Sequence, residues 1–289
     1  MGDQRRRSDF PERTEENGRI WDANARWWDD RIGDGNDFQT LLIEPATERL
    51  LAVSGGDVIL DIACGAGRLA RRLAERGARV VAFDQSERFI ARARERTPRD
   101  AAVEYRVLDA ADEGALLSLG AGRFDKAVCT MALMDMPVIE PMLSALTRLL
   151  KSGGVFVFSI THPCFHSSEA RRFAEVFEDE AGRHGVRTGV KVTLYRTPFA
   201  RKTEGIIGQP EAQYYFHRPI HALFGSCFAS GFVVDGLEEP GLPAPGERRA
   251  AAGWEDMPEI PPILVVRTRL EAGGRPATGT GGGGHAPRS

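Results

Sequence analysis

The sequence predicts an α/β fold of the Rossmann-like, doubly wound kind, with a sheet that is mostly parallel. Short β-branched runs alternate with amphipathic helical stretches, and one strand runs through a glycine-rich turn into a helix. An acidic residue also follows at the end of the next strand, as it does in nucleoside-binding α/β folds. Strands that alternate with helices imply parallel βαβ units and a sheet covered on both faces. We expect a single domain of this class.

The predicted elements begin with two helices and continue as strand–helix pairs. In chain order they are helices at 20–29 and 38–53, strand 58–62, helix 69–76, strand 79–83, helix 88–96, strand 103–107, a short helix near 113–119, strand 124–130, helix 140–150 and strand 155–160. After residue 160 the alternation of strands and helices stops. The segment at about 163–216 is long, mixed in polarity and punctuated by prolines, which indicates a cap inserted after the fifth strand. A helix at 218–230 and strands at 232–237 and 263–268 complete the sheet, and the last strand is expected to be antiparallel.

Composition indicates where the domain begins and ends and which kinds of partner are not expected. We expect a domain at 18–272, with a charged disordered tail at 1–17 and a glycine-rich disordered tail at 273–289. The net charge of −3 gives no basic field, so neither nucleic acid nor a membrane is an expected partner. No long apolar run or leader-like segment is present, which predicts a cytoplasmic protein. Of the 38 basic residues only four are lysine, a bias typical of a GC-rich bacterial gene.

The glycine-rich turn follows the strand that contains Asp61. Gly65 and Gly67 lie between this strand and the next helix, at the carboxyl edge of the sheet where open α/β folds bind ligands. Asp84 ends the following strand and can accept hydrogen bonds from both ribose hydroxyls. The same glycine spacing fits a dinucleotide site, but Asp61 would repel a pyrophosphate. S-adenosylmethionine has an ammonium and a sulfonium group and no phosphate, so Asp61 favours this cofactor.

At these residues the sequence resembles the class I S-adenosylmethionine-dependent methyltransferases, in the small-molecule branch that includes the ubiquinone and menaquinone enzymes. The first motif reads Asp61-Ile-Ala63-Cys-Gly65-Ala-Gly67, with alanine at the first glycine position. Four further motifs follow in order, at 84, 108–112, 124–131 and 149–154. The resemblance implies S-adenosylmethionine as cofactor and S-adenosylhomocysteine as product. The cofactor-binding residues that it implies are Asp61, Ala63, Gly65, Gly67, Asp84, Gln85, Asp109, Ala110, Thr130 and Met131.

The acceptor is expected above the ends of the fourth and fifth strands, beneath the cap. Two histidine-bearing segments bracket the cap, so His162 and His217 are candidates for proton transfer and acceptor orientation. Trp28, Met134, Tyr214 and Arg218 are the candidate acceptor-binding residues. Both histidines could instead serve only the local structure. A zinc site at residues 162, 164 and 166 is not favoured, because a matching ligand set is missing, so no metal is expected.

The sequence therefore predicts a methyltransferase that acts on a small-molecule acceptor by in-line methyl transfer. A bacterial secondary metabolite is the expected acceptor, and a monomer or homodimer is the expected assembly. Two alternatives stay open at this point: a nicotinamide-dependent oxidoreductase on a similar fold, and a catalytically silent S-adenosylmethionine-binding protein. The sequence does not choose among oxygen, nitrogen, sulfur and carbon as the methylated atom, and it leaves open whether a base is used.

Overall fold

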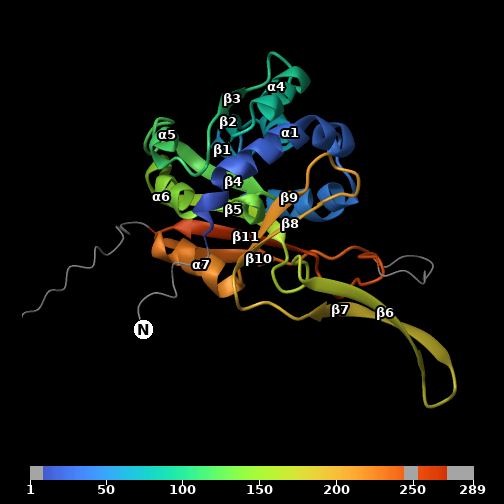
Figure 1. Ribbon diagram of the computed structural model, residues 1–289. Coiled ribbons are helices and arrows are strands. Elements are labelled where there is room, and N and C mark those ends of the chain that lie inside the picture. Colours follow the sequence, from blue (N-terminus) through green and yellow to red (C-terminus); the bar gives the residue numbers. More distant parts are fainter. Residues whose placement is uncertain (1–8, 244–252, 272–289) are drawn as a thin grey trace, which may run out of the picture.

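A computed structural model describes residues 9–243 and 253–271, and within these ranges the core is a seven-stranded sheet (Figure 1). Across the sheet the strands are β10 (Phe232–Glu238), β11 (Ile263–Leu270), β5 (Leu150–Thr161), β4 (Phe124–Thr130), β1 (Val58–Ile62), β2 (Arg79–Asp84) and β3 (Val103–Val107). Strands β1 to β5 pair in parallel, whereas β11 runs antiparallel between β5 and β10. The predicted sheet and its antiparallel last strand are confirmed.

Helices cover both faces of this sheet. They are α1 (Thr14–Ile32), α2 (Glu44–Leu51), α3 (Arg68–Glu75), α4 (Glu87–Arg96), α5 (Glu113–Leu117), α6 (Glu140–Leu149) and α7 (Ile220–Ala229). Successive side chains of β5 point to opposite faces of the sheet, which explains why helices cover both faces. Phe156 and Phe158 are buried in a hydrophobic core formed with α5, α6 and α7. Val155 and Val157 point to the opposite face, into the cluster that contains α2, α3 and α4. No helix in the described ranges is long and apolar enough to cross a membrane.

The structure corrects the predicted N-terminal tail for residues 9–17. A 3₁₀ turn at Pro11–Arg13 leads directly into α1, which begins at Thr14. Long-range contacts order this segment: the Asn17 side chain is 2% exposed and donates a hydrogen bond to the Asp135 carbonyl at 2.9 Å. The Phe10 ring packs against Phe216 with centroids 5.5 Å apart. Because these partners lie far along the chain, local periodicity gave no sign of them. Residues 1–8 and the predicted tail at 273–289 lie outside the described ranges.

The inserted segment at 163–216 forms two β-hairpins. One pairs β6 (Ala170–Glu178) with β7 (His184–Val192) and projects away from the sheet, as Figure 1 shows. The other pairs β8 (Phe199–Thr203) with β9 (Gln213–His217). Strand β9 contacts α1 and the 3₁₀ turn at Leu133–Asp135 that follows β4. The second hairpin therefore lies over the edge of the sheet at which β4 ends, the position expected for a cap.

Candidate functional site

The turn between β1 and α3 has a backbone that needs small residues. Ala63, Gly65 and Gly67 all have positive φ angles, of 53°, 52° and 74°. A Cβ atom added at Gly67 would lie 2.2 Å from the Tyr105 hydroxyl oxygen, so only glycine fits there. The Gly65 N–H donates a hydrogen bond to Asp84 Oδ2 at 3.0 Å, which fixes the turn against the end of β2.

This turn borders a pocket, which we call the turn pocket. It is enclosed by α1, the turn, the ends of β2 and β4 and the loop after β3. Eight of the ten predicted cofactor-binding residues line it: Ala63, Gly65, Asp84, Gln85, Asp109, Ala110, Thr130 and Met131. The other two predicted residues, Asp61 and Gly67, lie behind this lining in β1 and at the start of α3. The structure therefore brings residues from four of the five motifs to one pocket.

Two carboxylates in the turn pocket are held by backbone donors. Asp84 is 8% exposed and accepts hydrogen bonds from the N–H groups of Gly65 and Ser86, at 3.0 and 2.9 Å. Burial outweighs these bonds and raises the pKa of Asp84 to about 6. Asp109 Oδ1 accepts a hydrogen bond from the Ala111 N–H at 2.8 Å. Each carboxylate keeps lone pairs that can accept further bonds from a ligand.

Asp61 has the most unusual environment in the site. Its side chain is fully buried, and among the described residues neither carboxylate oxygen has a hydrogen-bond partner. Burial and the neighbouring Asp84 carboxylate raise the pKa of Asp61 to about 8, although the nearby Ala70 N–H offsets part of this shift. A buried acid without a partner is unfavourable in the empty protein and suited to a cationic group. The ammonium of S-adenosylmethionine is such a group, so the residues present fit this cofactor.

A second, larger cavity adjoins the turn pocket beneath the two hairpins, and we call it the hairpin cavity. Its volume is about 900 Å³, compared with about 140 Å³ for the turn pocket. Trp21, Met131 and Asp135 line both spaces and form the wall that they share. Trp28 and Met134, two of the predicted acceptor-binding residues, line the hairpin cavity. This arrangement provides one site for a nucleoside and an adjoining site for a second molecule.

Tyr214, also predicted to contact the acceptor, faces away from this cavity. Its hydroxyl donates a hydrogen bond to Glu16 Oε2 at 2.8 Å, and its ring stacks against Phe216 on the α1 side. Tyr215 lines the hairpin cavity instead. Since successive residues of a strand point to opposite faces, the prediction is displaced by one position.

His162, a predicted catalytic residue, lines neither the turn pocket nor the hairpin cavity. The imidazole is 2% exposed, and its Nδ1 accepts a hydrogen bond from the Cys164 N–H at 3.1 Å. The proton is therefore on Nε2, which donates to Glu239 Oε1 at 2.8 Å. Burial lowers the pKa of His162, so the ring is neutral. With both nitrogens bonded, His162 has a structural role in the turn after β5.

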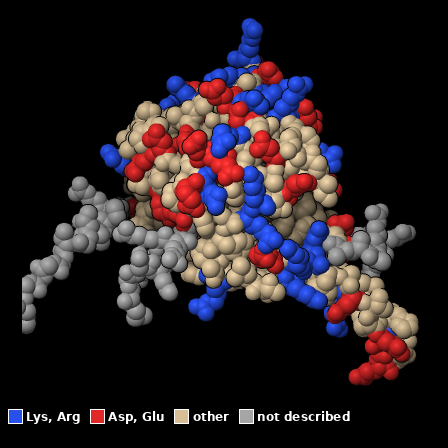
Figure 2. Space-filling view, in the orientation of Figure 1, with Lys and Arg blue, Asp and Glu red and all other residues tan. Residues whose placement is uncertain are grey.

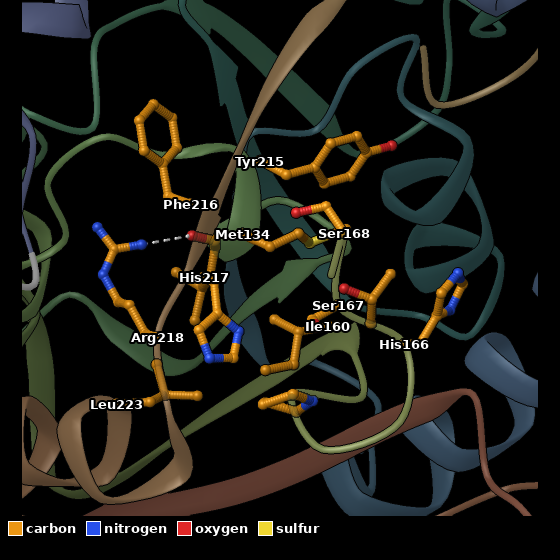
Figure 3. A pocket seen from close by; sticks show the side chains of 13 residues that line it. Met134, Ile160, His166, Ser167, Ser168, Tyr215, Phe216, His217, Arg218 and Leu223 are labelled. Carbon is orange, nitrogen blue, oxygen red and sulfur yellow. Dashed lines mark hydrogen bonds between the residues drawn. The ribbon is translucent and has the colours of Figure 1, made fainter. Parts of the chain in front are cut away.

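His217 and Arg218 are also held by their surroundings. His217 Nε2 donates a hydrogen bond to the Tyr195 carbonyl at 2.7 Å, and the ring stacks on Phe199. It lines a small recess beside the hairpin cavity, shown in Figure 3, but not the wall shared with the turn pocket. The Arg218 guanidinium donates to the backbone carbonyls of Leu133, Met136 and Pro137. Arg218 thus fixes the loop after β4; it lines the same small recess as His217 and does not line the hairpin cavity.

Two site residues were not predicted. Asp135 lines both the turn pocket and the hairpin cavity, and its Oδ1 accepts a hydrogen bond from Gln213 Nε2 at 3.4 Å. Burial raises the pKa of Asp135 well above its usual value. The sequence feature that could have identified Asp135 is its position as a single acid in the apolar segment 131–136, five residues after the fourth strand ends. For Tyr215, the sequence gives no indication of a role beyond its position in an aromatic strand.

Comparison with known proteins agrees with this geometry. Residues 60–158 match the family described as a methyltransferase domain. A ubiquinone biosynthesis O-methyltransferase of Pseudomonas paraeruginosa is 33% identical over 139 residues, which are 47% of this chain and 58% of that protein. The chain thus spans little more than half the length of the curated relatives that it matches.

Solved structures extend the likeness beyond that segment. An S-adenosylmethionine-dependent methyltransferase of Mesorhizobium loti has a TM-score of 0.60 at 27% identity, covering 78% of this chain and 96% of that one. The 1,6-didemethyltoxoflavin-N1-methyltransferase of Burkholderia thailandensis shares the fold, with a TM-score of 0.53 at 16% identity and coverage of 89% and 90%. Residues 60–158 therefore match the methyltransferase-domain family, and over most of its length the chain is similar to an S-adenosylmethionine-dependent methyltransferase of known structure.

Proposed function

We propose that the protein transfers the methyl group of S-adenosylmethionine to a small-molecule acceptor, and that the acceptor is a bacterial secondary metabolite. The observation that carries this proposal is the wall shared by the two cavities. Met131 and Asp135 face the turn pocket on one side and the hairpin cavity on the other. A cofactor in the first space and an acceptor in the second would meet at these residues.

The chain's own residues would hold the cofactor by complementary chemistry. Asp84 would accept hydrogen bonds from the ribose hydroxyls, and Asp109 with Ala110 would meet the adenine edge. Asp61 would interact with the ammonium group. When bound, S-adenosylmethionine supplies a methyl group on a positively charged sulfur. Holding the acceptor atom about 3 Å from this methyl group and excluding water accounts for up to about 7–11 kcal/mol of the barrier.

We assign proton transfer to Asp135 in place of the two histidines. An acceptor O–H or N–H in the hairpin cavity would give its proton to the Asp135 carboxylate, while its lone pair forms the new bond to carbon and the carbon–sulfur bond breaks. The carboxylate must be ionised to do this, and burial opposes ionisation. A cation in the adjoining turn pocket favours the ionised form. Asp135 would therefore act as a base once the cofactor is bound.

Calorimetric titration with S-adenosylmethionine, S-adenosylhomocysteine and NAD tests the cofactor assignment. We expect stoichiometric binding of the first two and none of NAD; tight NAD binding would favour the oxidoreductase alternative. Mass spectrometry of a metabolite panel incubated with the protein and S-adenosylmethionine tests turnover. Cofactor binding without a methylated product from any acceptor would favour the catalytically silent alternative.

Cofactor binding is expected to release protons between pH 6 and pH 8. In the free protein the pKa values of Asp84 and Asp61 are raised to about 6 and about 8, so one or both carboxyls are partly protonated in this range. A bound ammonium and ribose favour the ionised forms and lower both pKa values, so affinity should rise as the pH rises through the free-state values. Calorimetry with S-adenosylhomocysteine in phosphate and in Tris should give different binding enthalpies.

The difference between the two buffers should shrink in Asp61→Asn, which removes the group with the higher pKa. Equal enthalpies in the two buffers for the unaltered protein would contradict the proposed ionisation. The test needs no acceptor, so it examines the turn pocket alone.

A further inference from the structure

The hairpin cavity contains buried hydrogen-bonding groups that have no partner in the described part of the chain. They are the hydroxyls of Ser167 and Ser168 and the indole N–H of Trp28. Buried polar groups normally find a partner, since leaving one unpaired costs free energy. In Figure 3 the Ser168 side chain is directed toward the same space as Tyr215 and Met134. These unpaired groups indicate a ligand with hydrogen-bond acceptors.

Positive charge lies beside the two serines. Arg171 also lines the cavity, and its Nη1 is anchored by the Ser168 carbonyl at 2.8 Å and the Ala170 carbonyl at 3.3 Å. The guanidinium of Arg172 lies over the Trp254 ring, with its carbon 5.4 Å from the centroid. Figure 2 shows basic side chains gathered where the β6–β7 hairpin leaves the body of the protein. Arginine beside unpaired hydroxyls is a typical setting for an oxyanion.

Other titratable groups near these arginines leave the positive charge in excess. Arg31, from the last turn of α1, also lines the cavity, whereas Glu204 and Asp135 are its acidic side chains. Burial, and to a smaller extent the nearby Arg172 charge, lower the pKa of His166 to about 4, so this ring is neutral. The acidic Asp135 lies on the wall shared with the turn pocket, whereas Arg31, Arg171 and Arg172 line the hairpin cavity alone.

Aromatic side chains flank the space between the two ends. The rings of Trp21 and Trp28 lie 5.7 Å apart, and Tyr215 approaches from β9. A Cβ atom added at Gly205 would lie 2.4 Å from the Tyr215 hydroxyl oxygen and 3.2 Å from the Trp28 ring. The backbone of the β8–β9 loop thus packs directly onto both rings. Aromatic walls of this kind favour a flat ligand.

We propose that the hairpin cavity binds a planar aromatic or heteroaromatic molecule that carries a carboxylate. The carboxylate would lie at Ser167, Ser168 and Arg171, and the ring would lie along Trp28 and Tyr215. The end opposite the carboxylate would then face the wall formed by Met131 and Asp135. This proposal rests on the proposed function, because it takes the hairpin cavity as the acceptor site.

Matched probes test this proposal without turnover. We would titrate 6-hydroxy-2-naphthoate and its neutral amide into the full-length protein saturated with S-adenosylhomocysteine, using calorimetry and quenching of tryptophan fluorescence. The carboxylate should bind at least about tenfold more tightly than the amide, and this preference should weaken as salt is raised. Arg171→Gln combined with Ser168→Ala should reduce the preference to less than about threefold.

Arg187→Gln is the matched control, since Arg187 lies over the Phe177 ring on the neighbouring strand and does not line the cavity. It should leave the preference unchanged. Equal binding of acid and amide, no binding of either at millimolar concentration, or an equal preference in the Arg171 and Arg187 variants would overturn the proposal. Binding of S-adenosylhomocysteine is measured first in each sample, and its absence would count against the proposed function and not against the carboxylate site.

Discussion

Replacing Asp84 by alanine is expected to weaken S-adenosylmethionine binding by about 2–4 kcal/mol, or about 30-fold to 900-fold. The carboxylate lines the turn pocket, and although it accepts hydrogen bonds from the N–H groups of Gly65 and Ser86, it keeps lone pairs for two ribose hydroxyls. Charge-assisted hydrogen bonds of this kind are about twice as strong as neutral ones. Calorimetric titration of the variant measures the change directly.

Asp112→Asn provides the control for this experiment. Asp112 caps α5 through the Ala115 N–H and does not line the turn pocket, so its variant should keep the affinity of the unaltered protein. Asp84→Asn should give an intermediate loss, since an amide oxygen accepts hydrogen bonds without a charge. Thermal unfolding of each variant separates lost affinity from lost folding. An Asp84→Ala protein that is folded and binds S-adenosylmethionine normally would remove Asp84 from the site.

The turn pocket could be predicted because its signals are local. Asp61 and Asp84 end neighbouring strands, and parallel strands bring their carboxyl ends to one edge of the sheet. The glycines between β1 and α3 are needed by the backbone itself, as the close approach of Tyr105 to Gly67 shows. Short-range constraints of this kind remain visible in a single sequence.

On the predicted acceptor side, the placement of side chains depends on distant partners. His162 is hydrogen-bonded to Glu239, and His217 to the carbonyl of Tyr195. Both partners come from segments that show no periodic sequence pattern. Tyr214 and Tyr215 are chemically alike, so only the register of β9 decides which one faces the cavity. Sequence spacing identified segments that border the hairpin cavity and the recess beside it, but it did not show which side chains face the cavity.

Asp135 also could not be identified as a site residue from the sequence alone. An acid in an apolar run indicates an unusual environment, but its use depends on what packs around it. Asn17, in α1, donates a hydrogen bond to the Asp135 backbone carbonyl, and Gln213, in β9, donates one to the Asp135 carboxylate. Neither contact can be read from the residues near 135. The structure alone shows that this acid lies between the two cavities.

Replacing Asp135 by asparagine is expected to lower kcat by about 10²–10⁴-fold with an acceptor that must lose a proton. Asparagine keeps the shape and can still bond Gln213, but it cannot take the proton. Affinity for S-adenosylhomocysteine, which lacks the sulfonium charge, should change much less than kcat, since the ribose and adenine groups are held elsewhere. Steady-state kinetics with the acceptor from the metabolite panel, together with S-adenosylhomocysteine titration, measure both quantities.

The pH profile distinguishes a base from a residue that only shapes the wall. Burial raises the pKa of Asp135, and the titratable groups that face it, Tyr215 and Cys129, are themselves neutral because burial raises their pKa values. In the unaltered protein, kcat should therefore rise with pH as Asp135 ionises and level off above its pKa. This rise should be absent in Asp135→Asn, whereas His162→Asn and His217→Asn should keep it. If the rise persists in Asp135→Asn and disappears in one of the histidine variants, that histidine is the base and the assignment made here is wrong.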